Sequence, residues 1–213
     1  MNKGSLGFVF KFSLIFLGLL WCGHSFASEQ QAEKYPWSVL LYTGVTAKQQ
    51  LGTLFRGKYN SAGETLYTVE GAYILDQNNW FRKLVHPIVD TVQLAVNLTK
   101  RDADCDPEAI YEYNGYIIFR WTQFPWRKYV LTSLAAAEGV SYASHVPYVE
   151  QNVTSNGSRR LLNYLMFEIT IAAPKYPRIE LVGRIQHRSK AYGVFGNGNS
   201  GSSAIGLGVR YYF

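Results

Sequence analysis

Two residues near the end of the chain have the types and the spacing that nucleophilic catalysis uses. His187 and Ser189 lie two positions apart in the segment 178–189 (RIELVGRIQHRS). Residues two apart on a β-strand share a face. An imidazole beside a hydroxyl can accept its proton, and the oxygen can then attack a carbonyl carbon. The alternative is that both residues are structural: a histidine of the interfacial aromatic belt and a serine at the edge of a loop would mark where a strand leaves a membrane.

The pattern of this segment decides which way the pair faces. Its odd positions are apolar up to Ile185, whereas its even positions carry charge at Glu180, Arg184 and Arg188. In a membrane barrel the charged row faces the lumen and the apolar row faces lipid. His187 and Ser189 continue the apolar row, so we expect them on the outer wall. Glu168 and Glu180 are expected in the lumen beside Arg184 and Arg188, as paired charges that fill a small barrel.

The elements that must position the pair are strands, because a period of two recurs along the chain. In 90–99 (DTVQLAVNLT), Val92, Leu94, Val96 and Leu98 form one apolar row. Eight such segments predict an all-β, eight-stranded antiparallel transmembrane β-barrel. A soluble lipocalin-like barrel is the alternative, but the tyrosine-rich apolar rows and a final strand ending in Phe213 favour the membrane. The segments are 37–46, 65–76, 90–99, 110–124, 128–144, 160–172, 178–189 and 203–213; faces are hardest to assign in 128–144.

The connections are expected to alternate in length, as periplasmic turns and extracellular loops do. Short turns fall at 124–127 and 173–177, and longer loops at 47–64, 100–109, 145–159 and 190–202. The segment 77–89 is long on the side that should be short, which leaves room for an interfacial amphipathic piece.

The first 27 residues predict a cleavable signal peptide, followed by one barrel domain, 28–213. Lys3 precedes the apolar run 12–22, and Ser25-Phe26-Ala27 offers a small-x-small cleavage site. A lipoprotein site at Cys22 is the alternative. Only Cys105 then remains, so neither an internal disulfide nor a cysteine-based metal site is expected. The net charge of +6 is too scattered for a nucleic-acid partner and suits a surface covered with phosphorylated lipid.

The end of the chain also resembles a known family. His187 and Ser189, the Gly- and Asn-rich stretch with Asn197 and Asn199, and the final Gly-Val-Arg-Tyr-Tyr-Phe resemble the outer-membrane lipid A 3-O-deacylases (PagL-type, acyloxyacyl hydrolase-like). The resemblance implies a serine esterase at the outer leaflet, with Ser189 as nucleophile and His187 as general base. Its substrate would be lipid A of lipopolysaccharide, with no cofactor and no metal. The terminal Phe213 strand resembles the signal read by the outer-membrane assembly machinery.

Two departures from the family pattern stand beside this resemblance. The family usually has Asn after the serine, where this chain has Lys190, and an acidic residue where this chain has Ser203. Lys190 or a backbone N–H of 196–201 is a candidate to hold the oxyanion, and the Ser203 hydroxyl to accept the ring N–H. The alternative function is a non-catalytic small barrel in adhesion or envelope protection. A pore is not expected, because side chains fill an eight-stranded lumen.

Overall fold

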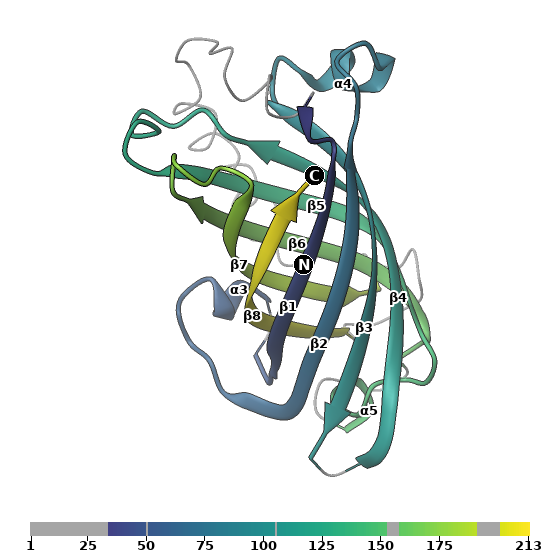
Figure 1. Cartoon of the computed structure of the whole chain (residues 1–213). Helices are drawn as coiled ribbons and strands as arrows, with labels where there is room; N and C mark the ends of the chain where they lie inside the picture. Colours follow the sequence, from purple (N-terminus) through teal and green to yellow (C-terminus); the bar gives the residue numbers. More distant parts are fainter. Residues whose placement is uncertain (1–33, 50, 105, 153–157, 191–200) are drawn as a thin grey trace, which may run out of the picture.

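Eight antiparallel strands close into one barrel in the computed structural model (Figure 1), because β8 pairs back onto β1. This confirms the predicted fold class. The structure describes residues 34–213 except 50, 105, 153–157 and 191–200, so the expected signal peptide and Cys105 lie outside the described residues. The strands are β1 (Trp37–Ala47), β2 (Ser61–Ile74), β3 (Thr91–Ala103), β4 (Asp106–Trp121), β5 (Leu131–Ala143), β6 (Leu161–Ala172), β7 (Ile179–Ser189) and β8 (Gly201–Tyr212).

Within the described residues, three short helices lie in the connections between strands, and two of them mark the two ends of the barrel. The α4 end holds α4 (Trp80–Val85) and the C-terminus, and the α5 end holds α5 (Tyr148–Asn152). The third, α3 (Leu51–Leu54), follows β1. Across the described ranges, no helix is long and apolar enough to cross a membrane.

The predicted long loop at 100–109 is wrong. β3 runs to Ala103 and β4 starts at Asp106, so a tight turn joins them. The charged residues of this stretch belong to the strands, because Arg101 faces the interior and pairs with Glu64 and Glu112 at 2.8 Å each. A run of charge in a barrel strand is stable when its inward members find buried partners.

Paired charges fill the middle of the barrel. Glu168 accepts hydrogen bonds from Arg120 at 2.7 Å, from Arg184 at 2.6 Å and from Arg210 at 2.6 Å. Glu70 lies beside Arg184 and Arg210 in the same network. All five side chains are almost fully buried. The lumen at this level is therefore occupied by side chains, as expected for eight strands.

A second charged cluster closes the α5 end. Arg188 donates to Glu112 at 2.6 Å and so belongs to this cluster, not to that of Glu168. From α5, the Glu150 carboxylate accepts a hydrogen bond from Ser202 at 2.8 Å, and the Val149 N–H donates to Glu64 at 2.9 Å. The helix thereby seals this mouth of the barrel.

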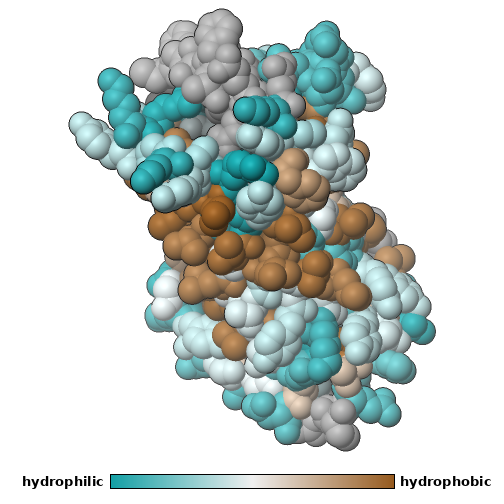
Figure 2. Space-filling model, viewed as in Figure 1, coloured by the Kyte–Doolittle hydropathy of each residue, from teal (hydrophilic) through white to brown (hydrophobic). Residues whose placement is uncertain are grey.

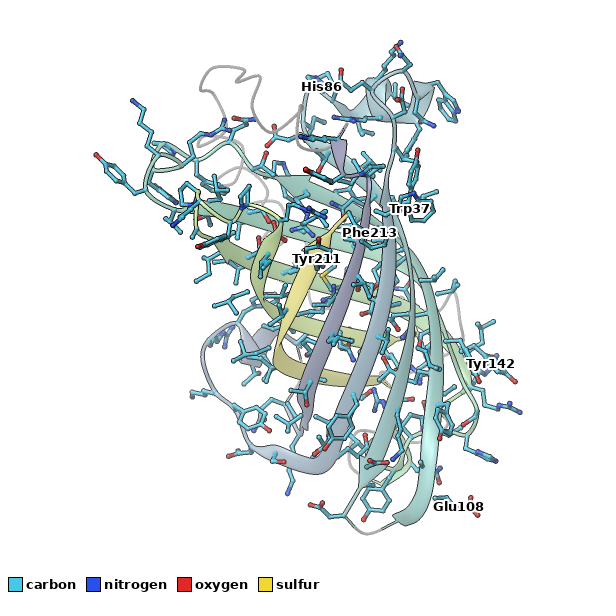
Figure 3. The ribbon with its side chains drawn as sticks, viewed as in Figure 1. Trp37, His86, Glu108, Tyr142, Tyr211 and Phe213 are labelled. Atoms are coloured by element: carbon cyan, nitrogen blue, oxygen red, sulfur yellow. The ribbon has the colours of Figure 1, made fainter. Side chains whose placement is uncertain are left out.

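The outer wall carries an apolar belt. Figure 2 shows hydrophobic residues in a band across the middle of the molecule, with hydrophilic residues toward both ends. Figure 3 shows Trp37, Tyr211 and Phe213 near the α4 end and Tyr142 on the side toward the α5 end. Aromatic residues at both edges of an apolar band are typical of a membrane barrel. Exposed members of the band include Leu41, Val69, Leu94, Val96, Leu98, Ile169, Leu181 and Leu207.

The segment after β2 folds back over this wall at the α4 end. Val92 has outward parity but is fully buried, because α4 residues Phe81 and Val85 pack against its cluster. Leu75, expected on the outer row of the second strand, lies past the end of β2 in the same cluster. Asn79 caps α4 by accepting from the N–H groups of the first turn. The long connection at 77–89 is thus a helix packed on the wall.

Candidate active site

The His187 ring lies on the outer wall and contacts the neighbouring strand. Alternation along β7 buries Arg184, Gln186 and Arg188 inside and leaves His187 half-buried on the opposite face. His187 pairs directly with Ser203 across β7 and β8, and its Nδ1 lies 2.9 Å from Ser203 Oγ. The hydrogen bond fixes the ring orientation and leaves Nε2 pointing away from Ser203. An imidazole held in this way can act as a base through Nε2.

Ser189 lies two residues further along the same outward row, at the last position of β7. It is half-buried and pairs with Gly201 on β8. Gly201 has φ +151°, and a Cβ there would lie 1.9 Å from the carbonyl oxygen of Arg188. Only glycine therefore lets β8 begin so close to the backbone that carries Ser189.

Asn163 on β6 is a neighbour of Ser189 that the sequence analysis does not identify. The two residues are direct partners across β6 and β7, and Asn163 is 9 % exposed. Its signal is its place in the row: the other odd positions of β6 are Leu161, Leu165, Phe167, Ile169 and Ile171. One amide in an otherwise apolar, outward row marks a polar spot on the wall.

A carboxylate occurs on the same wall, two strands from the imidazole. Glu138 on β5 is exposed and pairs with Leu165 on β6, which in turn pairs with His187. Two strand spacings separate Glu138 from His187, about 9–10 Å, and Leu165 lies between them. Glu138 therefore does not contact the ring, and Ser203 is the group at Nδ1. The face of Glu138 is hard to predict because the inward row of β5 is small: Ser133, Ala135, Ala137, Gly139, Ser141 and Ala143.

The connection between β1 and β2 crosses over this part of the wall. Phe55, just after α3, contacts the outward Phe167 of β6 edge to face, with ring centroids 5.1 Å apart. Since β8 and β7 lie between β1 and β6, the segment from Ala47 to Phe55 passes across their outer faces, and Figure 1 shows α3 beside β7 and β8. We call the described residues of this connection, 48, 49 and 51–55, the strap. Its course is consistent with Ser203 being only 2 % exposed although it has outward parity.

Of the two candidates for holding an oxyanion, the structure describes Lys190 and, of the segment 196–201, only Gly201. Lys190 directly follows β7 and is 4 % exposed. The alternation of β7 assigns position 190 to the inward row of Arg188, opposite to His187 and Ser189. The backbone of 196–200, with Asn197 and Asn199, lies outside the described residues, and Gly201 is the first residue of β8.

An apolar groove of about 770 Å³ lies on the adjoining outer wall. It extends over β1, β2, β3, β4, β7 and β8, and Lys100 lines it between its cross-strand partners Tyr67 and Tyr111. On β8, Leu207 brings the groove to within two outward positions of Ser203, and on β7, Leu181 brings it to within three of His187. Its apolar lining residues are Leu41, Val69, Leu98, Leu181, Leu207 and Val209.

The class of protein follows from three features: closed pairing of eight strands, an interior filled by charged side chains, and an apolar belt on the outer wall. The chain has the fold of a small outer-membrane β-barrel, and the belt and fold imply an outer-membrane location.

Comparison with solved structures finds barrels of this class. The outer membrane enzyme PagL superposes with a TM-score of 0.52 at 12% identity, covering 82% of this chain and 98% of that one. Neisserial surface protein A (NspA) gives 0.44 at 17% identity, covering 84% and 96%. The N-terminal β-barrel domain of Pseudomonas aeruginosa OprF gives 0.46 at 14%, covering 84% and 98%. At these identities the likeness shows the fold alone. No family model and no curated protein matches the sequence.

Proposed function

We propose that this chain is an outer-membrane serine esterase that removes an ester-linked 3-hydroxyacyl chain from lipid A. One observation carries the proposal: the His187 ring is held at Nδ1 by Ser203 on the outward face that also bears Ser189. The sequence resemblance of this segment to lipid A 3-O-deacylases and the PagL-like fold support it. The α5 end would face the cell exterior, so that the site meets the outer leaflet.

The chemistry follows from the hydrogen bond of the ring. When Nδ1–H donates to Ser203 Oγ, Nε2 keeps its lone pair and can act as the base toward Ser189. Nε2 takes the hydroxyl proton while Ser189 Oγ attacks the ester carbonyl. The imidazolium then protonates the leaving sugar alkoxide, and the acyl group stays on Ser189. Water, deprotonated by the same nitrogen, releases the hydroxy acid and restores the serine.

The surroundings suit a lipid substrate. A charge-filled lumen offers no route to the site, because Arg188 and Glu112 occupy the interior behind β7. From the bilayer, however, an acyl chain reaches the outward row directly. The apolar groove on the adjoining wall, which Lys100 and its flanking tyrosines also line, would hold further acyl chains.

Mass spectrometry of lipid A from cells that express the full chain tests the proposal. Cells with the native protein should lose one hydroxyacyl chain, whereas Ser189→Ala and His187→Ala should leave lipid A intact. Thr65→Ala removes a hydroxyl from an outward position of β2 and should behave as the native protein does. Intact lipid A in all four strains, with each protein folded in the membrane, would overturn the esterase. It would favour the non-catalytic barrel in adhesion or envelope protection.

A further inference from the structure

The Asn163 amide is a hydrogen-bond donor with no evident structural use. Its side chain is nine-tenths buried on the outer wall, and no hydrogen bond to it is found within the described part of the chain. On the inward face, Asn114 donates to Asn97 at 2.6 Å and Asn97 donates to Tyr116 at 3.0 Å, although among the described residues Gln186 Nε2 has no partner.

Asn163 faces the hydroxyl that would carry the reaction. It is the direct cross-strand partner of Ser189. Directly opposed residues in an antiparallel pair have Cβ atoms about 4.5–5.5 Å apart on the same face. An amide extends two bonds beyond Cβ and a serine hydroxyl one. The Nδ2–H groups therefore reach the space above Ser189 Oγ, where a carbonyl oxygen would lie during attack.

The outward positions of the neighbouring strands offer little else for this task. Along β5 to β8, the outward polar residues are Thr132, Glu138, Asn163, His187, Ser189 and Ser203. Asn163 is the only side-chain amide among them. Glu138 would repel an oxyanion, and His187 and Ser203 are bonded to each other.

We infer that Asn163 is the oxyanion-stabilising residue of this site, donating from Nδ2 to the carbonyl oxygen as Ser189 attacks. This inference rests on the proposed esterase function. As the Ser189 Oγ–carbon bond forms, the carbonyl π electrons move to the oxygen, and the negative charge lies beside the amide N–H. When the C–O bond to the sugar breaks, that charge returns to the carbonyl and the hydrogen bond weakens. Such a donor aids the transition state more than the bound ester.

Steady-state release of hydroxy acid from purified lipid A in mixed micelles tests the inference with full-length protein. Asn163→Ala removes the donor, and Asn163→Asp keeps the shape but replaces the donor with an acceptor. Both should lower kcat about 10²- to 10³-fold, the effect of losing one oxyanion donor, while KM changes little. Thr65→Ala is the matched control, since it also removes a polar group from an outward strand position and should keep native kcat.

Labelling of Ser189 by an alkyl fluorophosphonate gives a second readout. The phosphonyl oxygen takes the place of the carbonyl oxygen, so both Asn163 variants should label more slowly by a similar factor. A native kcat and labelling rate in folded Asn163→Ala would overturn the role of Asn163 and leave the esterase intact. A raised KM at native kcat would overturn it too, because the amide would then bind the ground state. If native protein releases no acid and Ser189 does not label, the esterase itself fails.

Discussion

The hydrogen bond between His187 and Ser203 gives the sharpest quantitative prediction. Ser203 Oγ lies 2.9 Å from Nδ1 of the His187 ring. Ser203→Ala removes a neutral hydrogen bond, which contributes about 0.5–1.5 kcal/mol. If the bond orients the ring for the transition state, kcat/KM should fall about 2- to 13-fold. Ser203→Asp should instead raise kcat/KM.

An aspartate at position 203 places a negative charge beside the imidazolium that forms during attack. Hydrogen bonds to charged groups contribute about 1.5–3 kcal/mol, against about 0.5–1.5 kcal/mol for neutral ones. The difference of about 1–1.5 kcal/mol corresponds to a gain of about 5- to 13-fold in kcat/KM. The aspartate side chain is one bond longer than serine, so the ring must move outward, and half-buried His187 has the room to do so.

The assay is release of hydroxy acid from lipid A by refolded protein, with folding checked by heat-dependent mobility in gels. Ser202→Ala is the matched control. It changes the same residue type one position away, but Ser202 faces inward and bonds Arg101 and Glu150. It should lower stability and leave kcat/KM unchanged. Native activity in Ser203→Ala together with no gain in Ser203→Asp would refute the view that Ser203 orients the ring.

Three further perturbations test the surroundings of the site. Gly201→Ala forces a Cβ against the Arg188 carbonyl oxygen and shifts the backbone at Ser189. Because a misplacement of about 1 Å costs about 10²-fold in rate, kcat should fall by that factor. A native kcat would show that the close contact between Gly201 and the Arg188 backbone is not needed for activity. Glu168→Gln removes the carboxylate shared by three buried guanidinium groups and should lower the free energy of unfolding by about 3–5 kcal/mol. Urea unfolding of the protein in vesicles measures this change. An unchanged midpoint would contradict the view that the network stabilises the barrel. Phe55→Ala removes a contact between two rings that contributes about 0.5–1.5 kcal/mol. Hydrogen exchange of the backbone amides of 51–56 should therefore become about 2- to 13-fold faster, while the strands stay protected. Exchange as slow as in the native protein would mean that other contacts hold the strap.

The strands were predictable because each carries its own signal. A period of two needs no knowledge of partners, so all eight strands and the outward face of His187 follow from local sequence. Errors arise where the signal depends on distant residues. Arg101 looks like loop charge until Glu64 and Glu112 are placed beside it. The contact between Phe55 and Phe167 joins residues far apart in sequence, and no local pattern marks it.

The site shows the same division between local and distant information. Position 203 is assigned by parity in β8, so its place beside His187 needs only the strand register. Asn163 belongs to a strand that carries no motif, and its nearness to Ser189 appears only once β6 is paired with β7. A contact between two strands cannot be predicted from either strand alone, even though the single amide in the apolar row of β6 can be seen in the sequence.

The arrangement of polar groups separates what the fold requires from what a function would require. Closing a small barrel demands that inward polar residues be paired, and Glu168 and Arg188 meet that demand. Nothing in the fold demands polar side chains on the lipid-facing wall, because apolar side chains are the ones that suit contact with lipid. Yet Asn163, His187 and Ser189 gather there on two neighbouring strands. Because side chains fill the lumen behind them, the proposed esterase function requires that the ester reach these groups from the bilayer.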